Sequence, residues 1–115
     1  MNRPFDQQEQ SAASTGAGWV EHVVLFKIRA GTSGDAVQAM RTGLESLPET
    51  IPGILDLSCG ENFCDRAKGM NFGLVVRFES ERALQLYVHH ADHVRVVETL
   101  VQPIVDDVLA LDYLH

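Results

Sequence analysis

The stretch WVEHVVLFKIR, residues 19–29, decides the fold of this chain. Its β-branched and aromatic side chains are typical of a β-strand, and alternate residues place one apolar set together. One face carries Val20, Val24, Phe26 and Ile28 together with His22. The residues between them include Val23 and Leu25, so the opposite face is apolar as well. A strand with two apolar faces lies inside a sheet that is covered on both sides.

An amphipathic helix follows this strand. Ser33 offers a hydroxyl cap, and apolar residues then recur at three- and four-residue intervals, as on one face of a helix. These residues are Val37, Met40, Leu44 and Leu47. Pro48 and the pair Pro52-Gly53 end the helical pattern, because proline disfavours helical backbone in the residue before it.

Two further strands are expected after the prolines. Residues 54–62 predict the second strand, with Leu55, Leu57 and Cys59 on one face. Residues 63–71 are typical of a loop. The run FGLVVRF, residues 72–78, alternates again and predicts a third strand, antiparallel to the second.

The remainder of the chain predicts a helical region and a last strand. Ser80 can cap a helix whose apolar stripe comprises Ala83, Leu84, Tyr87 and Val88. A second helical period runs from Val94 to Val105, and Pro103 should kink or restart it. The run VLALDY, residues 108–113, predicts the fourth strand.

The resulting order, β-α-β-β-α-β, predicts an α+β protein with the ferredoxin-like plan, in which both helices pack on one face of the sheet. The other face carries large apolar side chains that a chain of 115 residues cannot leave in water. We therefore expect a homodimer in which the sheets of two protomers pack face to face as a dimeric α/β barrel.

Composition and net charge indicate how the chain is divided into domains and which classes of partner are disfavoured. Residues 1–18 are rich in Gln, Ser, Ala and Gly and are expected to form a flexible tail, which leaves residues 19–115 as one domain. A net charge of −7 argues against nucleic acid or an anionic membrane as partner. No apolar run approaches the roughly 20 residues of a membrane span. Cys59 and Cys64 are expected to be reduced thiols, and a cytoplasmic location is the default.

The stretch YVHHADH, residues 87–93, is the main chemical signal in the sequence. Histidine titrates near neutrality, so His93 is a candidate general base, with Tyr87 orienting it or donating to a substrate oxygen. The alternative is structural: His93 would order the backbone through a carbonyl, and Tyr87 would belong to the core.

His22 is either a polar group in a pocket or a hydrogen-bonded core histidine, since it shares a face with apolar residues. His89, His90 and His93 have spacings that a helix could present to a metal. We expect no metal site, because the chain shows no Cys or carboxylate set placed to complete the coordination.

Five segments resemble, in their order and spacing along the chain, the stress-responsive A/B barrel domain (Dabb) family. They are HVVLFKIRAG, IPGILDLSCGEN, FGLVVRFES, YVHHADH and VLALDY, and they span nearly everything from residue 21 onward. The resemblance implies a dimeric α/β barrel with a pocket between sheet and helices in each protomer. Within this family, plant polyketide cyclases such as olivetolic acid cyclase carry a Tyr-x-x-His-Pro-x-His pattern that is similar to the segment from Tyr87 to His93. They act without metal or organic cofactor.

That resemblance implies catalytic roles for His93, Tyr87 and His22. The proline of the cyclases' pattern corresponds to Ala91 in this chain, and a pocket histidine of the cyclases corresponds to Phe72. We expect a pocket that binds or transforms a small apolar keto or phenolic compound without a cofactor, with Phe26, Phe72 and Leu74 lining it; if the protein is an enzyme, it is a cofactor-independent cyclase or lyase. The alternatives are a non-catalytic, stress-associated structural dimer and a cofactor-free quinol-type monooxygenase.

Overall fold

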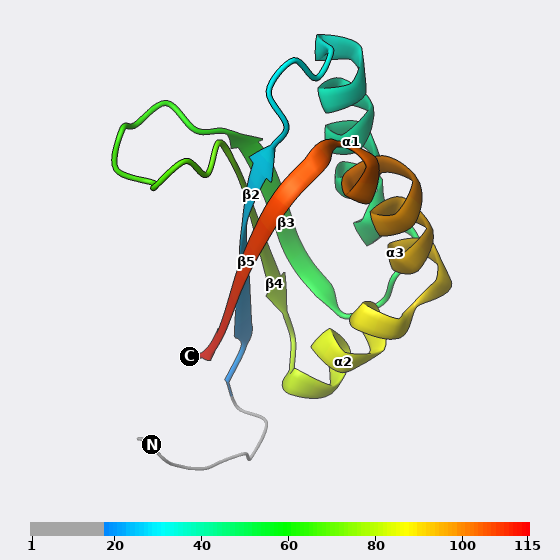
Figure 1. Ribbon diagram of the computed structural model, residues 1–115. Coiled ribbons are helices and arrows are strands. Elements are labelled where there is room, and N and C mark those ends of the chain that lie inside the picture. The colour runs from blue at the N-terminus through cyan, green and yellow to red at the C-terminus, as the bar shows by residue number, and fades with distance from the viewer. Residues whose placement is uncertain (1–17) are drawn as a thin grey trace.

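The computed structural model describes residues 18–115 and has a sheet with helices on one of its faces (Figure 1). The predicted tail, residues 1–18, lies outside this range except for Gly18. The main helices and strands, in chain order, are β2 (Val20–Ile28), α1 (Gly34–Ser46), β3 (Ile54–Glu61), β4 (Phe72–Phe78), α2 (Glu81–His89), α3 (Ala91–Val96) and β5 (Val105–Leu114). Short 3-10 segments at Leu47–Glu49 and Gln102–Ile104 and a π-helical turn at Val97–Val101 connect them.

The sheet has the strand order β3-β4-β2-β5, and every neighbouring pair is antiparallel. The first strand, β2, is therefore central, as its two apolar faces predicted. This topology is the ferredoxin-like plan, so the predicted α+β class is confirmed.

The core lies between the sheet and the helices. On β2 and β4 the buried side chains alternate, and cross-strand partners such as Val24 and Leu74 lie on the same face. Met40 from α1 and Tyr87 from α2 are fully buried against this layer, as are Val76 and Phe78 from β4. Burial of these side chains is the main stabilising term, at about 25 cal/mol per Å² of apolar surface.

Both predicted hydroxyl caps are present. The side chain of Ser33 accepts a hydrogen bond from the amide of Ala36, and that of Ser80 accepts one from the amide of Ala83, each at 3.1 Å. Each bond satisfies one of the free amides in the first turn of a helix. These caps set where α1 and α2 begin.

The second strand differs from the prediction at Leu55. A bulge between Ile54 and Asp56 inserts Leu55 as an extra residue, so its side chain is 56% exposed while Leu57 and Cys59 pack against the core. Strict alternation fails here because a bulge changes which face each residue occupies.

The end of the chain also differs from the prediction. Val105 begins β5 instead of ending a helix, and this strand extends to Leu114. Pro103 ends the helical region, because it lies in the 3-10 turn that follows the π-helical turn. Pairing with β2 over its whole length accounts for the longer strand.

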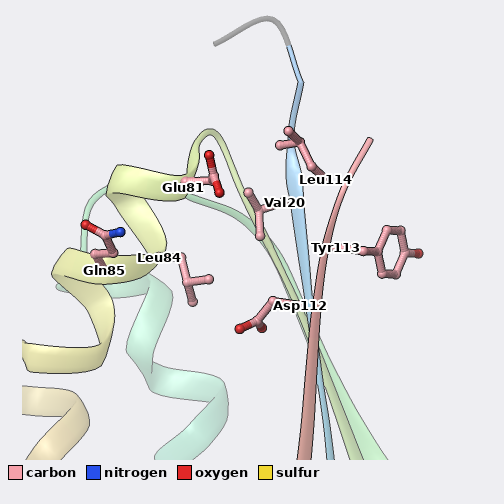
Figure 2. A pocket seen from close by; sticks show the side chains of 7 residues that line it. All are labelled: Val20, Glu81, Leu84, Gln85, Asp112, Tyr113 and Leu114. Carbon is pink, nitrogen blue, oxygen red and sulfur yellow. The ribbon is translucent and has the colours of Figure 1, made fainter. Parts of the chain in front are cut away.

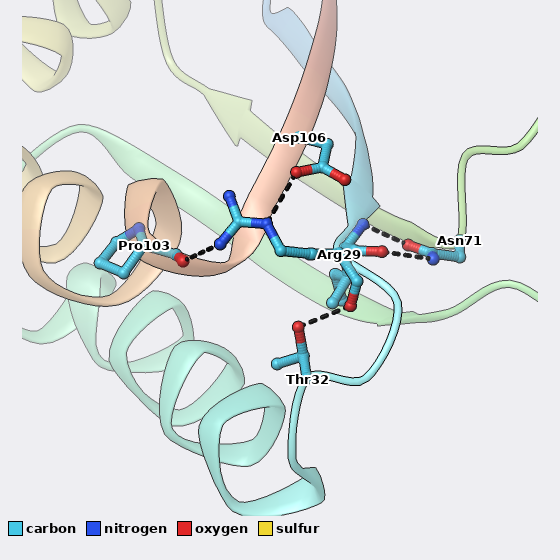
Figure 3. Close-up of polar contacts among 6 residues, drawn as sticks. Arg29, Thr32, Asn71, Pro103 and Asp106 are labelled. Carbon is cyan, nitrogen blue, oxygen red and sulfur yellow. Dashed lines mark hydrogen bonds and ion pairs between the residues drawn. The ribbon is translucent and has the colours of Figure 1, made fainter.

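Polar contacts close the sheet at the end of β2 (Figure 3). The side-chain amide of Asn71 accepts from the Ile28 amide at 2.7 Å and donates to the Ile28 carbonyl at 3.1 Å, so it continues the ladder as a backbone unit would. Arg29 donates to Asp106 at 2.9 Å and to the Pro103 carbonyl at 2.8 Å. The start of β5 is thereby tied to the end of β2.

The sheet face away from the helices carries a row of apolar side chains. Val75, Leu109 and Leu111 are 40%, 57% and 60% exposed on it. At one end of this face Arg77 donates twice to Glu21, at 3.1 and 3.0 Å, and its guanidinium lies over the Trp19 ring. We call this surface the open face. None of the helices in residues 18–115 is long and apolar enough to span a membrane.

Candidate functional site

His22, Tyr87 and His93 come from three different elements and meet on the helix side of the sheet. The ring centroids of Tyr87 and His93 are 4.2 Å apart, and those of His22 and Tyr87 are 5.9 Å apart. Phe78 closes the cluster, with its ring 4.9 Å from Tyr87. The three residues predicted to be catalytic are thus brought together, and we call them the His-Tyr-His cluster.

A break in the helix makes this meeting possible. On one continuous helix, Tyr87 and His93 would point about 120° apart around the axis, because each residue advances by about 100°. His90 instead has extended backbone and separates α2 from α3. Its ring Nδ1 accepts a hydrogen bond from the Asp92 amide at 3.1 Å and so caps α3. His90 is therefore a structural cap, a role the sequence interpretation missed.

The hydroxyl of Tyr87 is the unusual polar group of the cluster. Its side chain is fully buried, and the hydroxyl has no hydrogen-bond partner among the described residues. Burial raises the pKa of Tyr87 well above its usual value of 10, so the group stays a protonated donor at neutral pH. An unsatisfied buried hydroxyl costs about 1–3 kcal/mol. Such a group is a candidate ligand contact.

His93 is held in one tautomer by the backbone. Its Nδ1 lies 3.1 Å from the Val88 carbonyl oxygen, which can only accept, so Nδ1 carries the proton. The lone pair of a neutral ring then lies on Nε2. Burial lowers the pKa of His93, and the nearby His22 and His90 lower it further, although the bond to Val88 opposes the shift. The arrangement favours a neutral imidazole that can accept a proton.

Asp112 is the partner of His22. The two residues face each other in the pairing of β2 with β5, and the His22 Nδ1 lies 2.5 Å from the Asp112 carboxylate. A carboxylate can only accept, so the His22 Nδ1 donates this hydrogen bond. The sequence interpretation missed Asp112, since only the strand register places it opposite His22.

A groove lies between α2 and the ends of β2 and β5, and Asp112 is the member of this pair that lines it. It has a volume of about 170 Å³ and is lined by Val20, Glu81, Leu84, Gln85, Asp112, Tyr113 and Leu114. Figure 2 shows Leu84 on α2 and Asp112 on β5 pointing toward the space between them, whereas the Tyr113 ring points to the other side of β5. Asp112 thus connects the groove to His22.

The residues predicted to line a pocket, Phe26, Phe72 and Leu74, are buried in the core on the same face of the sheet as His22, and none of them lines the groove beside Asp112. The rings of Phe26 and Phe72 are 6.1 Å apart. Periodicity placed them on the correct face but carried no information on their position along it. Among residues 18–115, no group of three or more His, Cys, Asp or Glu side chains is arranged to hold a metal ion.

The model of the stress-responsive A/B barrel domain family matches residues 20–115. The chain belongs to this family. A stress-response A/B barrel domain-containing protein of Arabidopsis thaliana is 33% identical over 96 residues, which are 83% of this chain and 36% of that protein. A second such relative from Arabidopsis thaliana is 32% identical over 99 residues, 83% of this chain and 46% of that protein. This A/B barrel chain therefore spans less than half the length of these two relatives.

Solved structures share the A/B barrel fold. The Arabidopsis thaliana protein At3g17210 is 26% identical with a TM-score of 0.74, covering 82% of this chain and 92% of that chain. A dimeric ferredoxin-like protein of Thermobifida fusca is 24% identical, with a TM-score of 0.73 over 84% of this chain and 90% of its own. A hydroxynitrile lyase from Passiflora edulis is 16% identical, with a TM-score of 0.77 over 84% and 93%. The latter two likenesses bear on the fold alone.

An NMR titration of the A/B barrel domain should give His93 a pKa below 6.5, and His22→Asn should raise that pKa because it removes a repelling charge. Between the folded pKa and 6.5, the unfolded chain binds more protons at this residue than the folded chain. The contribution of His93 to stability is therefore lost as the pH falls through that window. A pKa at or above 6.5 would contradict the buried, neutral imidazole.

Proposed function

We propose that this chain is a homodimeric A/B barrel protein whose His-Tyr-His cluster binds a small keto or phenolic compound and moves a proton on it. The observation that carries the proposal is the buried Tyr87 hydroxyl, which has no partner among the described residues and lies beside the His93 ring. Buried polar groups are rarely left unsatisfied, so this hydroxyl is suited to a ligand oxygen.

The proposed chemistry uses the polar atoms of the cluster, first of all the His93 Nε2 and the Tyr87 hydroxyl. The Nε2 of His93 accepts a proton from the carbon beside a carbonyl group, and the Tyr87 hydroxyl donates a hydrogen bond to the carbonyl oxygen as negative charge develops there. The protonated His93 then returns this proton to the product, while Asp112 fixes the His22 ring beside the cluster. This proton-transfer sequence requires no cofactor.

The groove beside Asp112 favours a small, uncharged substrate. A cavity of about 150 Å³ accepts a benzene ring, so a groove of about 170 Å³ is suited to a compound of similar size. Glu81 and Asp112 place two carboxyl groups in its walls, which disfavours an anionic ligand. Small, uncharged keto and phenolic compounds meet both of these requirements, of size and of charge. At 16% identity, the Passiflora lyase supports only the fold's compatibility with an enzyme.

The proposed assembly is a dimer through the open face, in the cytoplasm. The dimeric ferredoxin-like neighbour from Thermobifida fusca supports the dimer, as do the exposed side chains of Val75, Leu109 and Leu111. The two cysteines, Cys59 and Cys64, are free thiols, which fits a reducing compartment.

Tyr87→Phe should separate stability from ligand binding. Removing an unsatisfied hydroxyl should leave the free energy of unfolding unchanged or raise it by about 1 kcal/mol. A thermal-shift screen of the unaltered chain against simple phenols and β-keto esters should identify compounds that stabilise it. The Tyr87→Phe variant should lose most of that stabilisation, because the compound loses its hydrogen-bond donor.

Tyr113→Phe is the matched control: Tyr113 borders the groove, but its side chain is 49% exposed and its ring points to the other side of β5, away from the groove. It should change neither the stability nor the ligand-induced shift. If no phenol or β-keto ester stabilises the unaltered chain, the non-catalytic structural dimer is the better explanation. Equal stabilisation of the unaltered chain and the Tyr87→Phe variant would exclude Tyr87 from the binding site.

A further inference from the structure

Phe63 is the most exposed large apolar side chain in the described part of the protein, at 102% of its reference area. The backbone on both sides of it is nevertheless held. The Asn62 side chain accepts from the Cys64 amide at 3.0 Å and donates to the carbonyls of Cys64 and Met70 at 2.9 and 3.1 Å. The Asn62 amide donates to the Asn71 carbonyl at 2.9 Å. Phe63 is thus presented to solvent by an ordered loop.

A hollow adjoins this side chain. Its volume is about 250 Å³, and its lining includes Leu25, Gly60, Phe63, Met70 and Gly73. Gly60 and Gly73 are cross-strand partners, and Leu25 is the partner of Gly73 on the next strand. Two paired glycines lack side chains where neighbouring positions carry them, so they leave the surface of the sheet bare.

The hollow continues the open face. Leu25 pairs with Leu109 on β5, so the row Gly60, Gly73, Leu25 and Leu109 crosses the sheet on the side away from the core. The β3–β4 loop extends away from the helical layer in Figure 1. Phe63 and the hollow therefore belong to the surface that we propose to meet a second copy.

We propose that the β3–β4 loop is a dimer latch: Phe63 becomes buried against the second copy, and the hollow over Gly60 and Gly73 receives an apolar side chain from it. This inference rests on the homodimer of the proposed function. Continuity with the open face favours a second copy as occupant. A lipid surface is disfavoured, because the loop's two basic residues, Arg66 and Lys68, are offset by Asp65 and by Glu61 at the rim, and the chain has a net charge of −7.

Two variants test the latch in the full chain by sedimentation equilibrium. Phe63→Ser removes the exposed ring, and Gly60→Leu fills the hollow. A Cβ at Gly60 meets nothing within 4 Å in the protomer, so the substitution is tolerated there. Each should raise the dimer dissociation constant about 10- to 100-fold, the range of an interface residue that contributes substantially. Circular dichroism should show unchanged secondary structure.

Leu86→Ser is the matched control, because Leu86 is also an exposed apolar residue, 53% accessible, but lies on α2. It should leave the dissociation constant unchanged. A dimeric unaltered chain whose dissociation constant is unaffected by Phe63→Ser and Gly60→Leu would overturn the latch and leave the dimer standing. A monomeric unaltered chain would overturn the dimer and the latch together, as would binding of the monomer to phosphatidylcholine vesicles through Phe63.

Discussion

A Leu111→Asp variant is expected to be a folded monomer at concentrations at which the unaltered chain is a dimer. Leu111 lies on the open face of β5, is 60% exposed, and pairs with Val23 on β2. In a symmetric interface each substitution counts twice, so two carboxylates would be buried without partners. The dimer dissociation constant should rise at least about 1000-fold, or about 4 kcal/mol. Sedimentation equilibrium measures this directly.

The matched control is Leu86→Asp, which places the same charge on the exposed side of α2. This variant should retain the dissociation constant of the unaltered chain. If Leu111→Asp remains dimeric, the two copies do not meet through the open face. If it loses its circular dichroism spectrum, the isolated protomer is unstable, and the milder Leu111→Ser should then give a weakened dimer of folded chains.

Phe78→Ala is expected to cost about 3–5 kcal/mol of unfolding free energy, the usual range for deleting a buried aromatic ring. Phe78 is fully buried at the end of β4. Its ring lies 4.9 Å from that of Tyr87 and 6.2 Å from that of His22, so its loss leaves a cavity beneath the His-Tyr-His cluster. Urea denaturation at a fixed protein concentration, followed by circular dichroism, should show the midpoint falling with little change in slope.

Two further variants serve as controls for Phe78→Ala. Leu86→Ala removes an exposed apolar side chain and should change stability by no more than about 0.5 kcal/mol. Phe78→Leu retains most of the volume and should cost less than the alanine variant. A Phe78→Ala cost below about 1 kcal/mol would mean that the surrounding side chains collapse into the space, and that the cluster is not rigidly supported.

The fold could be predicted from the sequence because each element has its own periodic pattern and its own end signals. Ser33 and Ser80 cap the helices that they were expected to cap. The bulge at Leu55 could not be predicted, because it exists only relative to the partner strand. The same is true of the early start of β5 at Val105, which depends on pairing with β2.

The candidate site was only partly predictable. The sequence pointed to Tyr87, His93 and His22 as a set, and the structure brings their rings together. It could not reveal Asp112, which is 90 residues from His22 along the chain. It placed Phe26, Phe72 and Leu74 on the correct face but could not tell that they do not line the groove beside Asp112, because a two-residue period identifies the face of a strand and not the position along the sheet.

By itself, then, the sequence determined the order of strands and helices, the two apolar faces of β2 and the clustering of histidines near residue 90, because these are properties of neighbouring residues. Only the tertiary structure decided that His90 breaks the helix so that His93 meets Tyr87, that Asp112 pairs with His22, and that Phe63 stands beside a hollow on the open face. These features depend on strand register and chain reversal, which bring together residues that no local pattern connects.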